Sequence, residues 1–208
     1  MKLDSVVFDL DGTLWDTTPA CATAWNRVLD RNRITYRPIR DVDVRKVTGR
    51  PHDDCIRETF GDLPPETVQL LIRETATEDN VEIERSGGVL YDGVAEGLRQ
   101  LADSLPLYIV SNCQSGYIDT FFRQTSLGHC FRDCECFGDT GMPKADNLRL
   151  LIERNRLKAP VMVGDTDGDR DAALQNGVPF FFVSYGFGKL EGEREYRSFP
   201  ELVRALLG

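Results

Sequence analysis

The stretch SVVFDLDGTL, residues 5–14, decides the fold of this chain. After Ser5 it begins with a β-branched and aromatic run, which predicts a short buried strand. The strand ends in an acidic turn, where Asp9 and Asp11 stand two residues apart and therefore project to the same side. Gly12 then lets the backbone turn sharply. The segment thus predicts a buried strand with paired carboxylates at its carboxyl end.

Three more short apolar runs follow along the chain. They occupy residues 107–110, 161–163 and 180–183. Continuous apolar runs, rather than alternating ones, are typical of strands buried on both faces of a parallel sheet. Amphipathic helical patterns separate these runs, at residues 92–104, 116–126, 145–155 and 169–176, and a last helix follows Ser198. The alternation predicts an α/β fold with a doubly wound, Rossmann-like parallel sheet.

One part of the chain departs from this alternation. Residues 16–87 contain helical patterns and no convincing strand, and the cluster Ser86-Gly87-Gly88 is typical of a hinge that returns the chain to the sheet. We therefore expect an inserted α-helical cap domain over residues 16–87. The α/β core catalytic domain is expected to comprise residues 1–15 and 88–208.

The composition is that of an ordinary globular protein, and its charge restricts the partners. Of 208 residues, 41% are hydrophobic and 28% are charged, and the formal net charge is −9. Nucleic acids and anionic membranes are polyanions, so we expect neither as a partner. No apolar run approaches the roughly 20 residues that span a bilayer, and no signal-peptide pattern opens the chain. We expect a cytoplasmic monomer whose six cysteines are free thiols.

Polar side chains follow three of the predicted strands at their carboxyl ends. They are Asp9, Asp11, Ser111 and Asp165. In an open parallel sheet the ligand binds beyond these ends, so we expect the four side chains to converge on one site. A carboxylate can act as the nucleophile in phosphoryl transfer. A second carboxyl nearby can protonate the leaving group and later deprotonate water. The pair Asp9 and Asp11 therefore suits the hydrolysis of a phosphate ester.

Two further elements suit the binding of phosphate oxygens. Ser111 and the Asn112 amide stand where a strand gives way to a loop before a helix. Lys144 precedes a predicted helix and can bring a single positive charge into the site. We therefore expect a small phosphorylated metabolite as the substrate.

Carboxylates gathered at one site would repel each other and an anionic substrate unless a cation lay between them. Mg²⁺ prefers hard oxygen ligands and keeps several waters. The carboxylates of Asp9 and Asp165, with a carbonyl oxygen at Asp11, would suit this ion, which also offsets charge on the transferring group. We therefore expect Mg²⁺ as the cofactor.

Taken in order, these motifs resemble the four-motif pattern of the haloacid dehalogenase superfamily. The pattern consists of residues 8–14, residues 110–112, Lys144 and residues 164–169. A helical insertion directly after the first motif resembles the subgroup with an α-helical cap, which includes phosphoglycolate phosphatases and β-phosphoglucomutases. The segment Tyr185-Gly186-Phe187-Gly188 also resembles a loop that is common in this subgroup.

The resemblance implies a role for each matching residue. Asp9 would be the nucleophile and Asp11 the general acid and base. Ser111 and Lys144 would hold phosphate, and Asp169 would be a second acid near Lys144 or the metal. The metal ligands would be Asp9, Asp11 and Asp165.

Selection among substrates is expected to come from the cap, because all substrates share the phosphoryl group that the core binds. The turn Gly49-Arg50-Pro51-His52-Asp53 joins two predicted cap helices and carries a guanidinium and an imidazole. Pro51 stiffens this turn, so its side chains would be presented at low entropic cost. We expect Arg50 or His52 to contact the part of the substrate that is not phosphate.

The sequence therefore predicts a Mg²⁺-dependent phosphatase that forms an aspartyl-phosphate on Asp9. One alternative is a sugar phosphomutase on the same scaffold, which would return the phosphoryl group to a sugar. Another is a non-enzymatic switch in which Asp9 accepts a phosphoryl group to change a binding surface. Asp11 argues against the switch, since an acid and base there would speed loss of the signal. Phosphoglycolate, sugar phosphates and nucleoside monophosphates all remain open as substrates.

Overall fold

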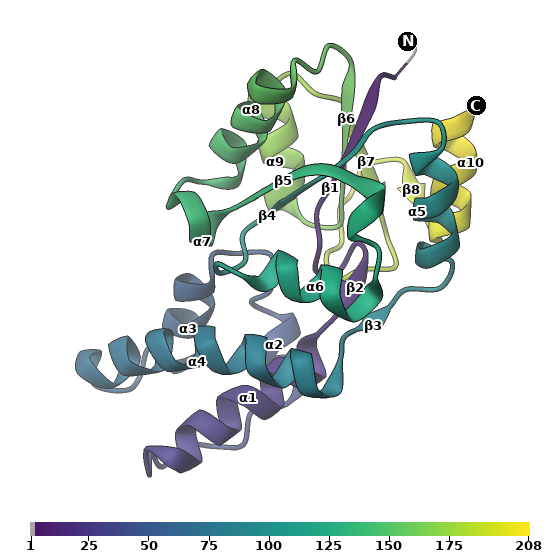
Figure 1. Ribbon diagram of the computed structural model, residues 1–208. Helices are drawn as coiled ribbons and strands as arrows, with labels where there is room; N and C mark the ends of the chain where they lie inside the picture. The colour runs from purple at the N-terminus through teal and green to yellow at the C-terminus, as the bar shows by residue number, and fades with distance from the viewer. Residues whose placement is uncertain (1–2) are drawn as a thin grey trace.

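The computed structural model describes residues 3–208, and its centre is a six-stranded sheet (Figure 1). The strands are β1 (Ser5–Phe8), β4 (Leu107–Ser111), β5 (Phe131–Cys136), β6 (Pro160–Gly164), β7 (Phe180–Val183) and β8 (Glu195–Tyr196). Their order is β5-β4-β1-β6-β7-β8, and each neighbouring pair is parallel. The predicted α/β fold with a doubly wound parallel sheet is confirmed.

Helices cover both faces of the sheet, as the alternation of side chains along each strand requires. In β1, Val6 and Phe8 pack into one apolar cluster and Val7 packs into the other. The helices on the Val6 face are α5 (Val94–Ala102), α6 (Tyr117–Thr125) and α10 (Phe199–Leu207). Those on the Val7 face are α8 (Lys144–Asn155) and α9 (Asp167–Gln175), and two short helices flank β5, η1 (Gly128–Cys130) and α7 (Phe137–Thr140).

Four helices interrupt the sheet between its first two strands in chain order. They are α1 (Thr18–Arg31), α2 (Asp41–Arg45), α3 (His52–Phe60) and α4 (Pro65–Ser86). Figure 1 shows them as a separate layer beyond the carboxyl end of β1. Helices α1 and α4 pack lengthwise, and Arg27 and Arg31 of α1 form ion pairs with Glu78 of α4. We call this layer the helical insertion.

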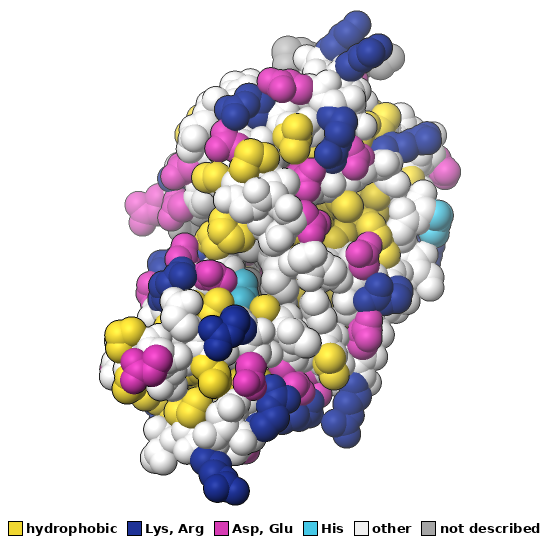
Figure 2. Space-filling model, turned by 60° about the vertical axis from the view of Figure 1, so that its left-hand side comes forward, with side chains coloured by type: hydrophobic (Ala, Val, Ile, Leu, Met, Phe, Trp, Pro, Cys, Tyr) yellow, Lys and Arg dark blue, Asp and Glu magenta, His cyan; other side chains and the backbone are white. Residues whose placement is uncertain are grey.

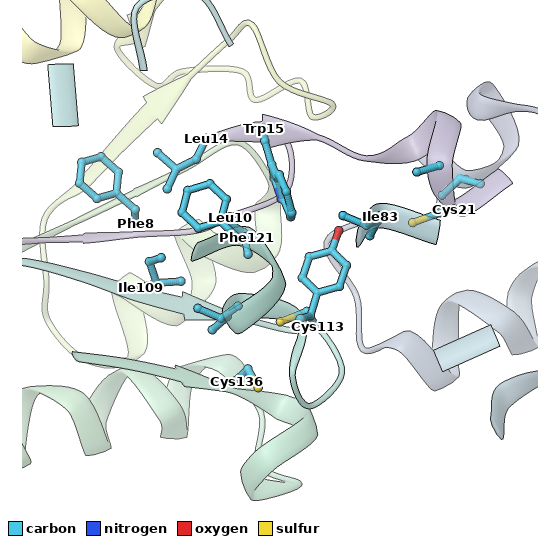
Figure 3. Packing of buried hydrophobic residues seen from close by; sticks show 14 of the residues in the cluster. Phe8, Leu10, Leu14, Trp15, Cys21, Ile83, Ile109, Cys113, Phe121 and Cys136 are labelled. Carbon is cyan, nitrogen blue, oxygen red and sulfur yellow. The ribbon is translucent and has the colours of Figure 1, made fainter. Parts of the chain in front are cut away.

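A small antiparallel ladder joins the helical insertion to the sheet. Strand β2 (Trp15–Asp16) pairs with β3 (Val89–Leu90), so the chain leaves and returns at adjacent points. Trp15 is fully buried and packs edge-on against Phe121, with ring centroids 4.9 Å apart, as Figure 3 shows. The sequence patterns did not predict β2 or β3, because two-residue strands are too short to show a period.

Two strands of the main sheet were also not predicted. Strand β5 reads Phe-Arg-Asp-Cys-Glu-Cys and lies at the edge of the sheet, where charged side chains are tolerated. Strand β8 has only two residues. Each of the six cysteines is a free thiol in the described chain. None of the described helices is both long and apolar enough to cross a bilayer.

Candidate active site

Four charged side chains meet beyond the carboxyl ends of β1 and β6. Asp9 follows β1, Asp165 follows β6, Asp169 lies in the first turn of α9, and Lys144 is the first residue of α8. All four are at most 4% exposed. Parallel strands β1 and β6 are neighbours, which is why residues more than 150 positions apart come together. We call these four residues the acidic cluster.

Lys144 bridges two of the carboxylates. Its Nζ donates to Asp9 Oδ1 at 2.6 Å and to Asp169 Oδ1 at 2.7 Å. Burial alone would lower the pKa of Lys144, but the two carboxylates outweigh burial and raise this pKa above its usual value. The ammonium is therefore permanently charged, and it fixes the orientation of the Asp9 carboxylate.

Asp169 is held by the chain that precedes it. Its Oδ2 accepts hydrogen bonds from the Thr166 amide at 2.9 Å and the Thr166 hydroxyl at 2.6 Å. Thr166 is also the N-cap of α9, so the two residues form a reciprocal capping box. The helix start thus fixes the Asp169 carboxylate that supports Lys144.

Asp165 is held by the loop after β7. Its Oδ2 accepts hydrogen bonds from the Phe187 amide at 2.7 Å and the Gly188 amide at 3.3 Å, and its Oδ1 accepts from the Thr13 hydroxyl at 3.2 Å. A Cβ on Gly188 would lie 1.9 Å from the Asp165 carbonyl oxygen, so only glycine allows this approach. Burial and the nearby Asp169 outweigh the amide donors and raise the pKa of Asp165 to about 7.

The acidic cluster fits a divalent cation. Carboxylate oxygens of Asp9, Asp165 and Asp169 all lie within 4.8 Å of one another. Three carboxylates and the Lys144 ammonium leave two uncompensated negative charges when all are ionised. Asp9 Oδ2 is buried and has no hydrogen-bond partner among residues 3–208. Burial, with repulsion from Asp169, raises the pKa of Asp9 well above its usual value, so a cation would relieve a real electrostatic cost.

Asp11 lies in a different environment from Asp9. Its Oδ1 is 3.0 Å from the Thr17 hydroxyl and 2.7 Å from the Tyr117 hydroxyl, and these two hydroxyls are 2.6 Å apart. Both hydroxyls donate to Oδ1, and these two hydrogen bonds favour the ionised carboxylate. Burial outweighs them and raises the pKa of Asp11 to about 6, so the carboxyl can gain or lose a proton close to neutral pH.

Thr17 and Tyr117 were not predicted as site residues. Thr17 follows the first motif within the sequence, but nothing in its local pattern distinguishes it from a helix cap. Tyr117 starts α6 and reads as part of the apolar face of that helix. Only the packing of α6 against β2 and α4 brings its hydroxyl to Asp11.

Ser111 and Asn112 lie next to each other but face different partners. Ser111 is buried at the end of β4, and its Oγ accepts a hydrogen bond from the Cys113 amide at 3.2 Å. Asn112 Nδ2 donates to the Gly49 carbonyl at 2.9 Å. The Asn112 side chain therefore connects the sheet to the helical insertion.

A cavity of about 60 Å³ lies between the sheet and the helical insertion. The lining on the sheet side of the cavity includes Asp9, Asp11, Ser111, Asn112 and Lys144. Figure 2 shows acidic and basic side chains interspersed over one face, which is hollowed at mid-height. The residues that line the cavity from the helical insertion are Cys21, Trp25, Val44, Val47, Thr48, Gly49, Arg50, His52, Cys55 and Asp79.

The two expected specificity residues both line the cavity but differ in exposure. The Arg50 side chain is 53% exposed and pairs with Glu58. His52 is buried, and its Nε2 lies 2.9 Å from the Thr75 hydroxyl. Burial lowers the pKa of His52 to about 4, so the ring is neutral at neutral pH.

Comparison with known proteins agrees with this fold. The sequence profile of the family described as haloacid dehalogenase-like hydrolase matches residues 6–183. The phosphoglycolate phosphatase of Vibrio cholerae is 28% identical over 98% of this chain and 93% of its own length. The phosphoglycolate phosphatase of Nitrosospira multiformis is 29% identical over 91% of this chain and 86% of its own.

Solved structures show the same fold at lower sequence identity. A predicted phosphatase from Clostridium acetobutylicum has a TM-score of 0.82 at 24% identity, covering 100% of this chain and 99% of that one. A predicted phosphoglycolate phosphatase from Haemophilus somnus has a TM-score of 0.86 at 19% identity, covering 99% and 98%.

The chain therefore belongs to the haloacid dehalogenase-like hydrolases. Within this family it is a phosphatase, a phosphoric monoester hydrolase of the phosphoglycolate phosphatase-like subgroup. The resemblance inferred from the four motifs is confirmed.

Proposed function

We propose that this phosphatase hydrolyses a small phosphomonoester, depends on Mg²⁺, and forms an aspartyl-phosphate on Asp9. The observation that carries the proposal is Asp9 Oδ2, a buried carboxylate oxygen without a partner in the described chain, on a residue that lines the cavity. Lys144 holds the other oxygen of the same carboxylate. The free oxygen is therefore the one available to a substrate or a cation.

The first step joins Asp9 to the phosphoryl group. An Asp9 carboxylate oxygen attacks phosphorus, and the bond between phosphorus and the ester oxygen breaks. Asp11 donates its proton to that ester oxygen, so the alcohol leaves neutral. Burial supports this role because it raises the pKa of Asp11 to about 6, so the carboxyl can hold a proton close to neutral pH.

The second step releases phosphate. Asp11, now ionised, takes a proton from water, and the resulting oxygen attacks phosphorus. The acyl phosphate bond breaks, which restores the Asp9 carboxylate. The hydroxyls of Thr17 and Tyr117 both donate to the ionised Asp11 and stabilise it in this form.

Mg²⁺ would be held by carboxylate oxygens of Asp9 and Asp165, with a carbonyl oxygen at Asp11 as a third ligand. When bound, the ion would offset negative charge on the phosphoryl group. The Asp11 side chain is engaged by Thr17 and Tyr117 and lies outside the acidic cluster, which leaves its backbone as the contributing part. Asp169 supports the site through its contact with Lys144.

Ser111, Asn112 and Lys144 are proposed to bind phosphate oxygens, since all three line the cavity beside Asp9. The Asn112 side chain is already bonded to the Gly49 carbonyl, so its backbone amide is the group assigned to phosphate. The Ser111 hydroxyl and the Lys144 ammonium would contribute a hydrogen bond and a positive charge.

We propose that residues 16–87 form a cap domain over a core of residues 1–15 and 88–208. The position of the helical insertion beyond the carboxyl end of β1 supports this division, and so does the lining that the two parts share in one cavity. A cap would exclude water from the acyl phosphate and contact the leaving alcohol. Arg50 and His52 are proposed to take part in that contact.

The test is phosphate release from a panel of phosphomonoesters that includes 2-phosphoglycolate, the substrate in the names of the Vibrio and Nitrosospira relatives. We expect release with Mg²⁺ or Mn²⁺, none in excess chelator, and inhibition by Ca²⁺, whose looser coordination would misplace the nucleophile. Turnover in excess chelator would refute the cofactor. Mass spectrometry of the quenched enzyme should find the phosphoryl group on the peptide that contains Asp9.

The same panel tests the mutase alternative. A mutase would convert a bisphosphorylated sugar to an isomer without releasing free phosphate. The names of the relatives favour the phosphatase. A long-lived phosphorylated protein without turnover would instead favour the phosphoacceptor switch.

A further inference from the structure

A buried carboxyl group lines the cavity from the helical insertion. Asp79, in the middle of α4, is 2% exposed and lines the cavity. Its Oδ2 lies 3.4 Å from the Trp25 indole nitrogen, a long hydrogen bond. Its Oδ1 is buried without a partner among the residues that the structure describes. A buried oxygen of this kind costs stability, so a bound group that satisfies it would be favoured.

His52 presents a second acceptor at the same place. The Thr75 hydroxyl donates its single proton to the Leu71 carbonyl at 2.7 Å. In the contact between His52 Nε2 and that hydroxyl, the proton must therefore come from the ring. In the neutral ring this leaves Nδ1 as an acceptor, and Nδ1 lies 3.6 Å from Asp79 Oδ2. The two side chains cannot satisfy each other at this distance without a donor between them.

The remaining lining offers a second anionic group one buried neutral donor, Gln114 Nε2, which has no partner among the described residues. From the helical insertion it consists mainly of apolar side chains and thiols, including Cys21, Trp25 and Cys55. Among the lining residues the permanent cations are Lys144, which two carboxylates already hold, and Arg50, which is half-exposed and paired with Glu58. A second anionic group on the substrate would meet the Asp79 carboxyl rather than a buried cation.

The size of the cavity restricts the substrate further. Its volume is about 60 Å³. A single water needs roughly 10–15 Å³ on the same measure, so the space is that of about four to six waters. A phosphate ester of a short alcohol suits this space better than one of a long alcohol.

We propose that Asp79 and His52 form a pair of hydrogen-bond acceptors that selects phosphate esters of short alcohols with a hydroxyl or amino donor. This inference rests on the proposed phosphatase reaction at Asp9. Burial raises the pKa of Asp79 well above its usual value. The protonated carboxyl still keeps an acceptor oxygen, and the neutral His52 ring keeps Nδ1 as an acceptor.

A matched series of two-carbon esters tests the inference in the unmodified enzyme. Ethyl phosphate, 2-hydroxyethyl phosphate, 2-aminoethyl phosphate and 2-phosphoglycolate differ only at the end remote from the phosphoryl group. We expect kcat/KM for the hydroxyethyl or aminoethyl ester to exceed that for ethyl phosphate by tenfold or more. If ethyl phosphate matches both donor esters, or if 2-phosphoglycolate is the best substrate, the inference is overturned.

The variant Asp79→Leu, which is close in volume and lacks acceptors, should reduce the preference for the donor esters over ethyl phosphate to within twofold. The control Glu74→Gln lies one turn away on α4, pairs with Arg31 outside the cavity, and should keep the wild-type preference. An unchanged preference in a folded Asp79→Leu variant would remove Asp79 from the assignment.

Failure of this inference can be told apart from failure of the proposed function. Para-nitrophenyl phosphate with Mg²⁺ reports the reaction at Asp9 without requiring a donor on the leaving group. If the enzyme hydrolyses this ester but shows no preference in the two-carbon series, only the selection by Asp79 and His52 fails. If it hydrolyses none of the esters, the proposed reaction itself fails.

Discussion

Asp9 lines the cavity from the sheet and Asp79 lines it from the helical insertion, and each has a buried carboxyl oxygen without a partner in the part of the chain described here. Their surroundings differ. Asp9 is held by the Lys144 ammonium and crowded by Asp165 and Asp169, whereas Asp79 is surrounded by an indole, a neutral imidazole and thiols. The same residue type therefore stands in a charged environment on one side of the cavity and in a mainly neutral one on the other, which is why we propose different roles for the two.

The substitution Asp9→Asn should cause the largest loss of activity. The amide has the shape of the carboxylate but cannot form an acyl phosphate, so we expect turnover to fall by about 10⁴-fold or more while the fold is kept. Phosphate release from para-nitrophenyl phosphate measures the loss, and circular dichroism checks the fold. Activity within a few-fold of wild type would contradict the assignment of Asp9 as the nucleophile.

Replacing Lys144 should show that its ion pairs stabilise the acidic cluster. In Lys144→Met, Asp9 and Asp169 lose the cation that both contact, and breaking a buried ion pair of this kind costs about 3–5 kcal/mol. The free energy of unfolding from urea titration measures the effect. The control Lys158→Met removes an exposed lysine and should change stability by less than about 0.5 kcal/mol. Equal effects would mean that the acidic cluster does not depend on Lys144.

His52 should make the stability of the helical insertion sensitive to acid. Its pKa is about 4 in the folded protein, against 6.5 for an unperturbed ring, so the unfolded chain takes up a proton first as pH falls. Stability present above pH 6.5 is therefore lost progressively down to pH 4, by about 3 kcal/mol from this group. Comparing the pH dependence of unfolding in wild type and His52→Gln isolates this contribution. Parallel curves would show that the ring is not held neutral.

Arg50 should show the smallest effect on stability, which sharpens the contrast with the buried pair. Its ion pair with Glu58 is about half exposed on both sides, and such pairs contribute at most about 1 kcal/mol. We expect Arg50→Ala to lower the free energy of unfolding by less than this amount. We also expect it to lower kcat/KM on the best two-carbon ester less than Asp79→Leu does. A larger kinetic effect from Arg50 would move substrate recognition to the rim of the cavity.

The fold could be predicted where the sequence carries a strong local period. The four strands called from apolar runs and the main helices are all present, because buried parallel strands are continuously apolar. Strand β5 was not predicted because an edge strand keeps charged side chains such as Arg132 and Asp133. The small strands were not predicted because their pairing depends on residues distant in the sequence, as between Trp15 and Leu90.

The candidate site could be predicted at the ends of strands but not inside the helical insertion. The turns after β1 and β6 can be recognised in the sequence because acidic residues interrupt apolar runs there. The pairing of these two strands then brings Asp9 and Asp165 together. Asp79 gives no such signal. It stands in the polar run Thr-Glu-Asp-Asn, residues 77–80, where an acid on a helix is ordinarily solvated. Its burial comes from the packing of α1 against α4, which no local pattern specifies.

The ladder between β2 and β3 has a consequence for how this molecule can change over evolution. Because Trp15 pairs with Leu90 and Asp16 with Val89, the two ends of the helical insertion lie next to each other. A segment with a different number of helices could therefore replace the insertion without changing the order of the strands in the main sheet. We therefore expect a chimera that carries the insertion of another family member to keep its sheet and its acidic cluster while acquiring the substrate preference of the donor. If the insertion selects the substrate, as we propose, substrate preference can be exchanged between family members as one continuous segment of the chain.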